Sequence, residues 1–289
     1  MQQRTVAVDG LAFSYLEAGP AHGPLALCLH GFPDTAHTWR HLLPALAGAG
    51  YHAVAPWMRG YAPTAVPADG NYQVGALATD ANALHQAFGA GADAVLVGHD
   101  WGAFASYGAA TLEPDRWRRV VTVAVPPVAA SAGSFFTYAQ LKRSFYVFLF
   151  QLPLAEMALA VDDLAFLDGL WADWSPGYDA TWDLSQVKRA LGSPEHLAAA
   201  IGYYRAAFDP THHDPAYDEA QAASAGAPPQ PTLYFHGADD GCMTVAVVDD
   251  LDTVLAPGSE HVTVPGAGHF LHLEQPELVA ERVLRFLRA

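Results

Sequence analysis

The residues with the clearest potential for chemistry lie directly after short apolar runs. Residues 94–97, Ala-Val-Leu-Val, lead into Gly-His-Asp-Trp-Gly at residues 98–102, and a helical stretch follows. Glycines on both sides of a strand-to-helix turn let the backbone turn sharply and hold the middle side chain above the sheet. That side chain is Asp100, whose carboxylate can attack a saturated carbon bearing a strained or good leaving group. The alternative is that Asp100 only caps the following helix, and its position directly after a buried strand makes that role less favoured.

An acid and a base follow two later strand-like runs. Residues 232–235 lead to Asp239 and Asp240, and residues 262–264 lead through a glycine-rich turn to His269. Ligands in open α/β sheets bind at the carboxyl ends of the strands, and the chain order nucleophile, acid, base is that of a hydrolytic triad. The spacing favours Asp240 as the acid, with Asp239 as the alternative. The other histidines near strand ends are interpreted as packing or supporting residues: His30, His99, His236 and His272.

The loop after an earlier apolar run completes this group of segments. Leu25–Leu29 is uniformly apolar and leads into His-Gly-Phe-Pro at residues 30–33. In a site of this kind, the loop after that strand and the residue after the nucleophile each supply a backbone N–H to an oxyanion. We therefore expect the amides of Phe32 and Trp101 to form an oxyanion hole.

Such a site requires a mostly parallel sheet with helices on both faces, which is an α/β fold. Strand-like and helical stretches alternate up to residue 124 and again from residue 232, as expected of such a sheet. The predicted strands are residues 5–8, 11–16, 25–29, 52–55, 94–97, 120–124, 232–235 and 261–264, and the predicted helices are residues 39–47, 74–88, 103–112, 245–255 and 277–287.

An insertion interrupts this alternation. Residues 128–227 contain no strand-like run, are rich in aromatic residues and end in a linker of Ala, Gly and Pro. A stretch of about a hundred residues is too long for a simple loop in a compact domain. The sequence therefore predicts a core of residues 1–127 and 228–289, interrupted by a helical cap of residues 128–227.

The composition of the chain limits its expected cellular location and its expected binding partners. The chain has 289 residues, of which 52% are hydrophobic, and its formal net charge is −16, which disfavours binding to nucleic acid. Two cysteines imply no disulfide framework, the first nine residues lack the apolar run of a signal peptide, and no stretch suits a membrane span. We expect a cytoplasmic protein with no nucleic-acid or membrane partner, and the sequence allows a homodimer. No zinc-type spacing and no phosphate-binding glycine motif occurs, so no metal or cofactor is expected.

Together these segments resemble the epoxide hydrolase branch of the α/β-hydrolase superfamily, which uses an aspartate nucleophile. The resemblance covers nearly the whole chain and includes the Arg-Gly-Tyr segment at residues 59–61. It implies two cap tyrosines that protonate the epoxide oxygen, one four residues before a Phe-Gln-x-Pro segment and one before an arginine late in the cap. Tyr146 and Tyr204 occupy those places. In one departure, Trp57 stands where related enzymes carry an aspartate, which puts the wall of the pocket in doubt.

The implied reaction is hydrolysis of a small apolar epoxide to a vicinal diol. Asp100 attacks a ring carbon to form an alkyl-enzyme ester, and His269, oriented by Asp240, activates the water that cleaves it. The residues expected to contact the substrate are His30, Pro33, Trp101 and Phe150.

Two other functions use the same residues. A haloalkane or haloacetate dehalogenase shares the aspartate nucleophile, and the indoles of Trp101 and Trp57 could bind its departing halide. A departing halide needs no proton from two tyrosines, and Trp101 stands where haloacetate enzymes place an arginine for the substrate carboxylate. A non-catalytic ligand-binding protein on this fold is less favoured, because all three triad positions are filled.

Overall fold

The central element of the protein is a twisted, mostly parallel sheet. The computed structural model describes residues 1–289, the side chain of Ala132 excepted. The strands of the described residues are β1 (Gln2–Val8), β2 (Leu11–Ala18), β3 (Leu25–Leu29), β4 (His52–Pro56), β5 (Ala94–His99), β6 (Trp117–Val123), β7 (Thr232–Gly237) and β8 (Glu260–Val264). They lie in the order β1-β2-β4-β3-β5-β6-β7-β8. β2 runs antiparallel to its neighbours β1 and β4, and every neighbouring pair from β4 to β8 in this order is parallel. The expected α/β class is confirmed.

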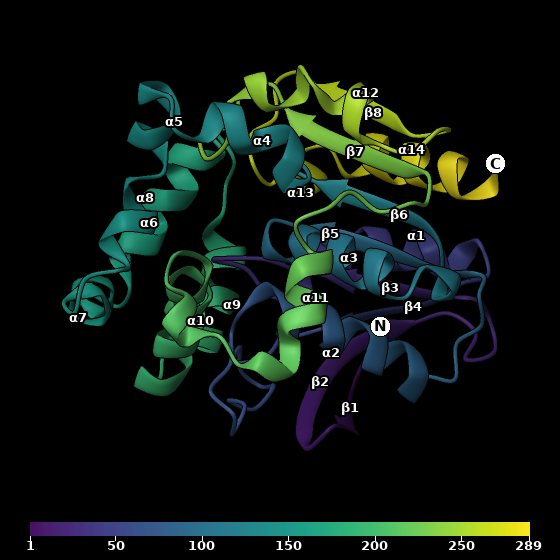
Figure 1. Cartoon of the computed structure of the whole chain (residues 1–289), viewed down its shortest axis with the longest axis horizontal. Helices are drawn as coiled ribbons and strands as arrows, with labels where there is room; N and C mark the ends of the chain where they lie inside the picture. The colour runs from purple at the N-terminus through teal and green to yellow at the C-terminus, as the bar shows by residue number, and fades with distance from the viewer.

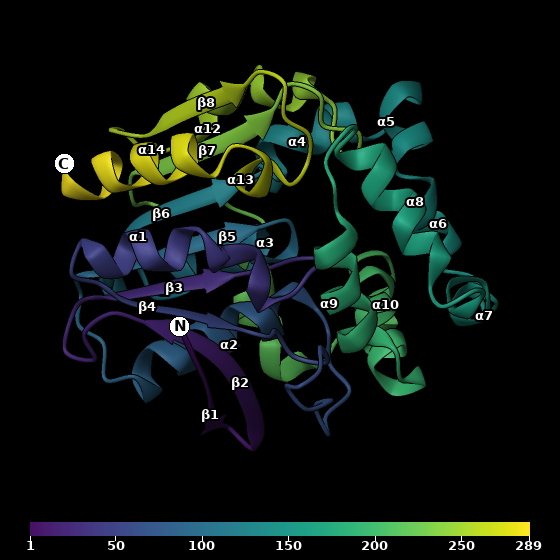
Figure 2. The ribbon, with the colours of Figure 1, turned by 180° about the vertical axis from the view of Figure 1, so that it is seen from behind.

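Helices cover both faces of this sheet. Figure 1 shows α2 (Val74–Ala87), α3 (Trp101–Leu112) and α11 (Asp218–Ala223) in front of it, and Figure 2 shows α1 (Leu42–Gly48) and α14 (Pro276–Arg288) on the opposite face. The central strands β3, β4, β5 and β7 are buried along their whole length, as strands covered on both faces must be. These strands are apolar in sequence because helices cover both faces of the sheet.

A helical segment joins β6 to β7. Its helices are α4 (Val128–Phe135), α5 (Tyr138–Arg143), α6 (Phe145–Leu149), α7 (Ala155–Ala160), α8 (Ala165–Trp174), α9 (Thr181–Leu191), α10 (Pro194–Phe208) and α11. Helices α5 to α10 gather beyond the carboxyl ends of the parallel strands, whereas α11 packs against α2 and α3 of the core (Figure 1). The division at residues 128 and 227 stays a prediction. None of the helices described here is long and apolar enough to cross a membrane.

Two predicted helices differ from the structure. The stretch 39–47 forms a short 3-10 helix, η1 (Ala36–Arg40), followed by the separate helix α1, and the stretch 245–255 forms η5 (Val245–Val248) and α12 (Leu251–Val254). Pro44 explains the first break, because a residue without an N–H fits only the first turn of a helix, and α1 starts two residues before it.

Candidate active site

Asp100 occupies a sharp turn between β5 and α3. Its backbone adopts φ 52° and ψ −118°, a conformation that side-chain-bearing residues rarely populate. The flanking glycines make this turn possible: a Cβ at Gly102 would lie 2.1 Å from the carbonyl oxygen of Leu29, and one at Gly98 would lie 2.2 Å from that of Gly102. The strained turn is held by this close packing, and the Asp100 carboxylate is thereby fixed at the end of β5.

The two oxygens of the Asp100 carboxylate have different surroundings. Oδ1 accepts a hydrogen bond of 2.8 Å from the backbone N–H of Phe32, whereas Oδ2 lies 3.8 Å from Nε2 of His269. Gly31 lets the Phe32 loop come this close, because a Cβ there would lie 2.3 Å from Oδ1. Burial raises the pKa of Asp100, while His269 and the amides of Phe32 and Trp101 act in the opposite direction. Oδ2 is therefore the oxygen that is free to react.

His269 is held by a second carboxylate. Its Nδ1 lies 2.9 Å from Oδ2 of Asp240, whose other oxygen accepts the backbone N–H groups of Cys242 and Met243 at 2.7 and 2.8 Å. The side chain of Asp239 is exposed, so Asp240 is the carboxylate that contacts the imidazole. Burial opposes a charge on His269, but the Asp240 carboxylate and the Cys242 side chain together outweigh burial and raise the pKa of the imidazole well above its ordinary value. When His269 is neutral, a proton on Nδ1 leaves Nε2 as a base.

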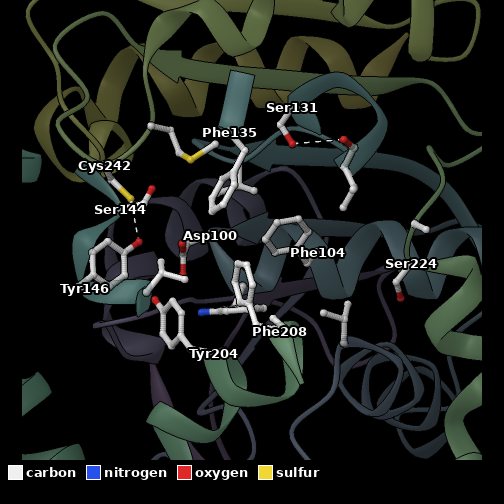
Figure 3. A pocket seen from close by; sticks show the side chains of 18 of the residues that line it. Asp100, Phe104, Ser131, Phe135, Ser144, Tyr146, Tyr204, Phe208, Ser224 and Cys242 are labelled. Atoms are coloured by element: carbon white, nitrogen blue, oxygen red, sulfur yellow. Dashed lines mark hydrogen bonds between the residues drawn. The ribbon is translucent and has the colours of Figure 1, made fainter. Parts of the chain in front are cut away.

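Tyr146 and Tyr204 extend from the helical segment toward the same space as Asp100 (Figure 3). Tyr146 belongs to α6 and Tyr204 to α10, and their ring centroids are 5.6 Å apart. The Tyr146 hydroxyl lies 3.4 Å from Sγ of Cys242, whereas the buried Tyr204 hydroxyl has no hydrogen-bond partner among the described residues. Burial raises the pKa of both phenols well above their usual value, so both hydroxyls are proton donors at neutral pH.

A cavity of about 460 Å³ joins Asp100 to the two tyrosines, whereas His269 and Asp240 are not among its lining residues. Asp100, Trp101, Tyr146 and Tyr204 line it, and most of the remaining wall is apolar, with Phe104, Phe135, Phe136 and Phe208 as its aromatic members. A cavity of this size and polarity suits a small, largely apolar organic molecule. Cys242 and Met243 also belong to the wall, and no motif of the sequence points to either as a site residue. Their position just after Asp240 was the one signal that could have pointed to them.

Three residues predicted to contact substrate are not among those that line this cavity: His30, Pro33 and Phe150. The fully buried His30 binds the Gly31 carbonyl through Nδ1 and accepts the Met58 N–H on Nε2, which suits a neutral ring, and burial lowers its pKa to about 4. Phe150 packs edge-on against the ring of Phe32 at 5.5 Å. Their contact with substrate stays a prediction.

Trp57 is also absent from the lining of this cavity. It is buried and packs edge-on against the ring of His37 at 5.2 Å. The Pro33 carbonyl accepts the indole N–H of Trp171 at 2.9 Å, which ties its loop to α8.

Behind His269 lies a buried group formed by Asp34, His99 and His272, whose potential metal-binding atoms lie within 4.8 Å of one another. Burial raises the pKa of Asp34 and lowers those of both histidines, so the group tends toward its neutral form, in which a carboxyl is a poor metal ligand. His99 Nε2 donates to the carbonyl of His269 at 3.1 Å. This hydrogen bond helps to hold the backbone of His269 in place. The other group with a metal-like composition is Asp240, Cys242 and His269, which contains the acid–base pair itself.

Comparison with known proteins gives a consistent result. Residues 24–276 match the family model described as alpha/beta hydrolase fold. The chain is 29% identical to an epoxide hydrolase of Caballeronia sordidicola, over 100% of this chain and 94% of that protein. It is 30% identical to epoxide hydrolase 3 of Mus musculus, over 98% of this chain and 76% of that protein. It is also similar to the crystal structure of epoxide hydrolase A from Mycobacterium thermoresistibile, with a TM-score of 0.81, 26% identity and coverage of 100% and 98%.

Proposed function

The chain belongs to the α/β-hydrolase fold family and is an epoxide hydrolase-like hydrolase, and we propose that it converts an epoxide to a vicinal diol through a covalent ester on Asp100. The observation that carries this proposal is the position of Asp100. Its Oδ1 is bound by the Phe32 amide, and its Oδ2 is free on the side of a cavity that also contains two tyrosine hydroxyls. A nucleophile and two proton donors are what opening of a strained ring requires.

The surroundings of the carboxylate favour direct attack on carbon over action as a general base. If Oδ2 attacks a ring carbon, Oδ1 becomes the carbonyl oxygen of the ester, and it already accepts the Phe32 N–H at 2.8 Å. In the next step that oxygen develops negative charge, and the same amide, with that of Trp101, would stabilise it. A general base would gain nothing from amide donors on its second oxygen, since they lower its basicity.

The tyrosines supply the proton for the opening ring. The hydroxyl of Tyr204 is buried without a partner among the residues described, so it is available to donate to an epoxide oxygen. Tyr146 shares its hydroxyl with Cys242 at 3.4 Å, and a bound oxygen could replace this contact because a thiol is a weak hydrogen-bond partner. As the C–O bond breaks, the second phenol donates a hydrogen bond to the oxygen while negative charge develops on it. The oxygen takes a proton from the first phenol, which becomes a phenolate.

His269 then activates water for cleavage of the ester. Its Nε2 faces Asp100 at 3.8 Å and has no hydrogen-bond partner among the described atoms, while Nδ1 is bound to Asp240. Water held near Nε2 would give up a proton as it attacks the ester carbonyl, and the Asp240 carboxylate would stabilise the imidazolium. The alkoxide that leaves the ester takes the proton of the new Asp100 carboxyl group, and the imidazolium of His269 returns its proton to the phenolate. Release of the diol then restores Asp100, His269 and the tyrosines to their starting forms.

Product analysis separates this function from its alternatives. Purified protein would be incubated with aryl and alkyl epoxides and, in parallel, with haloalkanes and haloacetates, and diol and free halide would be measured. We expect diol formation that is lost in Asp100→Asn. Halide release with no diol would identify a dehalogenase, and binding without turnover would identify a ligand-binding protein.

Three further expectations belong to this proposal. The substrate is a small apolar epoxide, in keeping with the apolar wall of the cavity. The cytoplasmic location and the homodimer both stay predictions, which cell fractionation and analytical ultracentrifugation would test.

A further inference from the structure

Cys242 lies in the wall of the active-site cavity, two residues after Asp240. Its side chain is buried, and Sγ is 3.4 Å from the hydroxyl of Tyr146 (Figure 3). The backbone N–H of Cys242 donates to Oδ1 of Asp240, the carboxylate that also binds His269. The thiol therefore has a fixed position relative to the acid and the base, and it reaches the space that a ligand would occupy.

The base assigned to ester cleavage lies close to the same thiol. Sγ of Cys242, a ring nitrogen of His269 and a carboxylate oxygen of Asp240 all lie within 4.8 Å of one another. His269 is fully buried, and its Nε2 has no hydrogen-bond partner within the described part of the chain. A thiol beside an imidazole that is itself held by a carboxylate is the arrangement that activates a nucleophilic cysteine. The cavity then supplies the access that a buried thiol otherwise lacks.

We infer that Cys242 is a second nucleophile of this cavity and a site of covalent modification by small, soft alkylating electrophiles such as haloacetamides. In this step a sulfur–carbon bond forms, the carbon–halogen bond breaks, the halide leaves with the electron pair, and the thiol proton passes to Nε2 of His269. The product is a thioether. Unlike an ester on Asp100, it is joined to the protein by a carbon–sulfur bond that attack of water on a carbonyl cannot break, so the adduct persists and blocks the space beside Tyr146.

Cys28 provides an internal control for this inference. It lies in β3, is fully buried, contacts the carbonyl of Ala26 and is not among the residues that line the cavity. Burial raises the pKa of both thiols, so acidity does not single out Cys242. Access from the cavity and the nearby His269 are the features that distinguish the two sulfurs.

The test is labelling of the folded, full-length protein with iodoacetamide, followed over time by intact mass, peptide mapping and residual hydrolase activity. We expect one carbamidomethyl group, located on Cys242, and a loss of activity at the same rate. Cys242→Ser keeps a hydroxyl near Tyr146 but removes the soft nucleophile, so it should take up no label and keep its own starting activity. His269→Gln should slow the labelling of Cys242 at least tenfold, because the acceptor of the thiol proton is gone.

Several outcomes would overturn the inference. Labelling of Cys28 first, or of both thiols at equal rates, would show that access to the cavity does not select Cys242. No label on the native protein, with two labels after denaturation, would show that the thiol is inert. Unchanged labelling of a folded His269→Gln variant would show that His269 is not the base for the thiol. Full hydrolase activity after labelling would show that the adduct does not block the active site. The mass readout needs no epoxide turnover, so it stands apart from the proposed function.

Discussion

Replacing His269 with Gln separates the two chemical steps of the proposed reaction. Glutamine can keep a polar contact with Asp240 but cannot take a proton from water. Ring opening depends on the carboxylate of Asp100 and on the tyrosine hydroxyls, none of which is removed. The second step loses its general base, so the ester on Asp100 should accumulate after substrate is added.

The expected size of the effect follows from the role of the base. General-base catalysis contributes about a hundred- to ten-thousand-fold, which corresponds to about 3–5 kcal/mol in the barrier for ester cleavage. The first step loses less, because His269 affects Asp100 only by helping to keep it ionised across a 3.8 Å gap. Burial raises the pKa of Asp100, so the experiment belongs at mildly alkaline pH, where the carboxylate stays ionised in the variant as well.

Intact-protein mass spectrometry in the seconds to minutes after mixing is the direct assay. Most of the His269→Gln protein should gain the mass of one epoxide, and peptide mapping should locate the gain on Asp100. The double variant with Asp100→Asn should gain nothing, and His212→Gln, an exposed histidine of the helical segment, should behave like the parent protein. A folded His269→Gln that binds substrate and carries no adduct, or carries it elsewhere, would refute Asp100 as the nucleophile.

Three other outcomes follow from the site and the fold. Replacing Tyr146 and Tyr204 together with Phe should lower ring opening at least about a hundredfold while circular dichroism stays unchanged, and each single change should leave residual activity; full turnover by the double variant would contradict the assignment. Only neutral His269 is a base, and its buried carboxylate partner raises the pKa of the imidazole. The rate of ester cleavage should therefore fall with decreasing pH, with a midpoint above about 6.5. Rapid cleavage well below that pH in single-turnover kinetics would require another base. Gly102→Ala would force a Cβ to 2.1 Å from the Leu29 carbonyl oxygen and should lower the free energy of unfolding by about 1–3 kcal/mol in denaturant titration, whereas an unchanged value would mean that the turn can relax.

The sequence was sufficient for the order of the elements and for the position of the turn at Asp100. Apolar runs such as residues 94–97 become buried parallel strands because a sheet covered on both faces favours apolar side chains. Gly98 and Gly102 mark a sharp turn because each is packed against backbone with no room for a Cβ. These are local properties, so a single chain read in order reveals them, and the expected α/β-hydrolase fold is confirmed.

Contacts between distant residues were decided only by the tertiary structure. Asp239 and Asp240 are adjacent and chemically identical in the sequence, but in the structure the first is exposed and the second lies 2.9 Å from His269. Cys242 gave no signal of its own, and its place beside Tyr146 depends on how α6 lies over the loop after β7. Local patterns determine strands and turns, because these depend on neighbouring residues. Which side chains meet at the strand ends depends on the register of the sheet and on the packing of the helices above it, and no short segment contains that information.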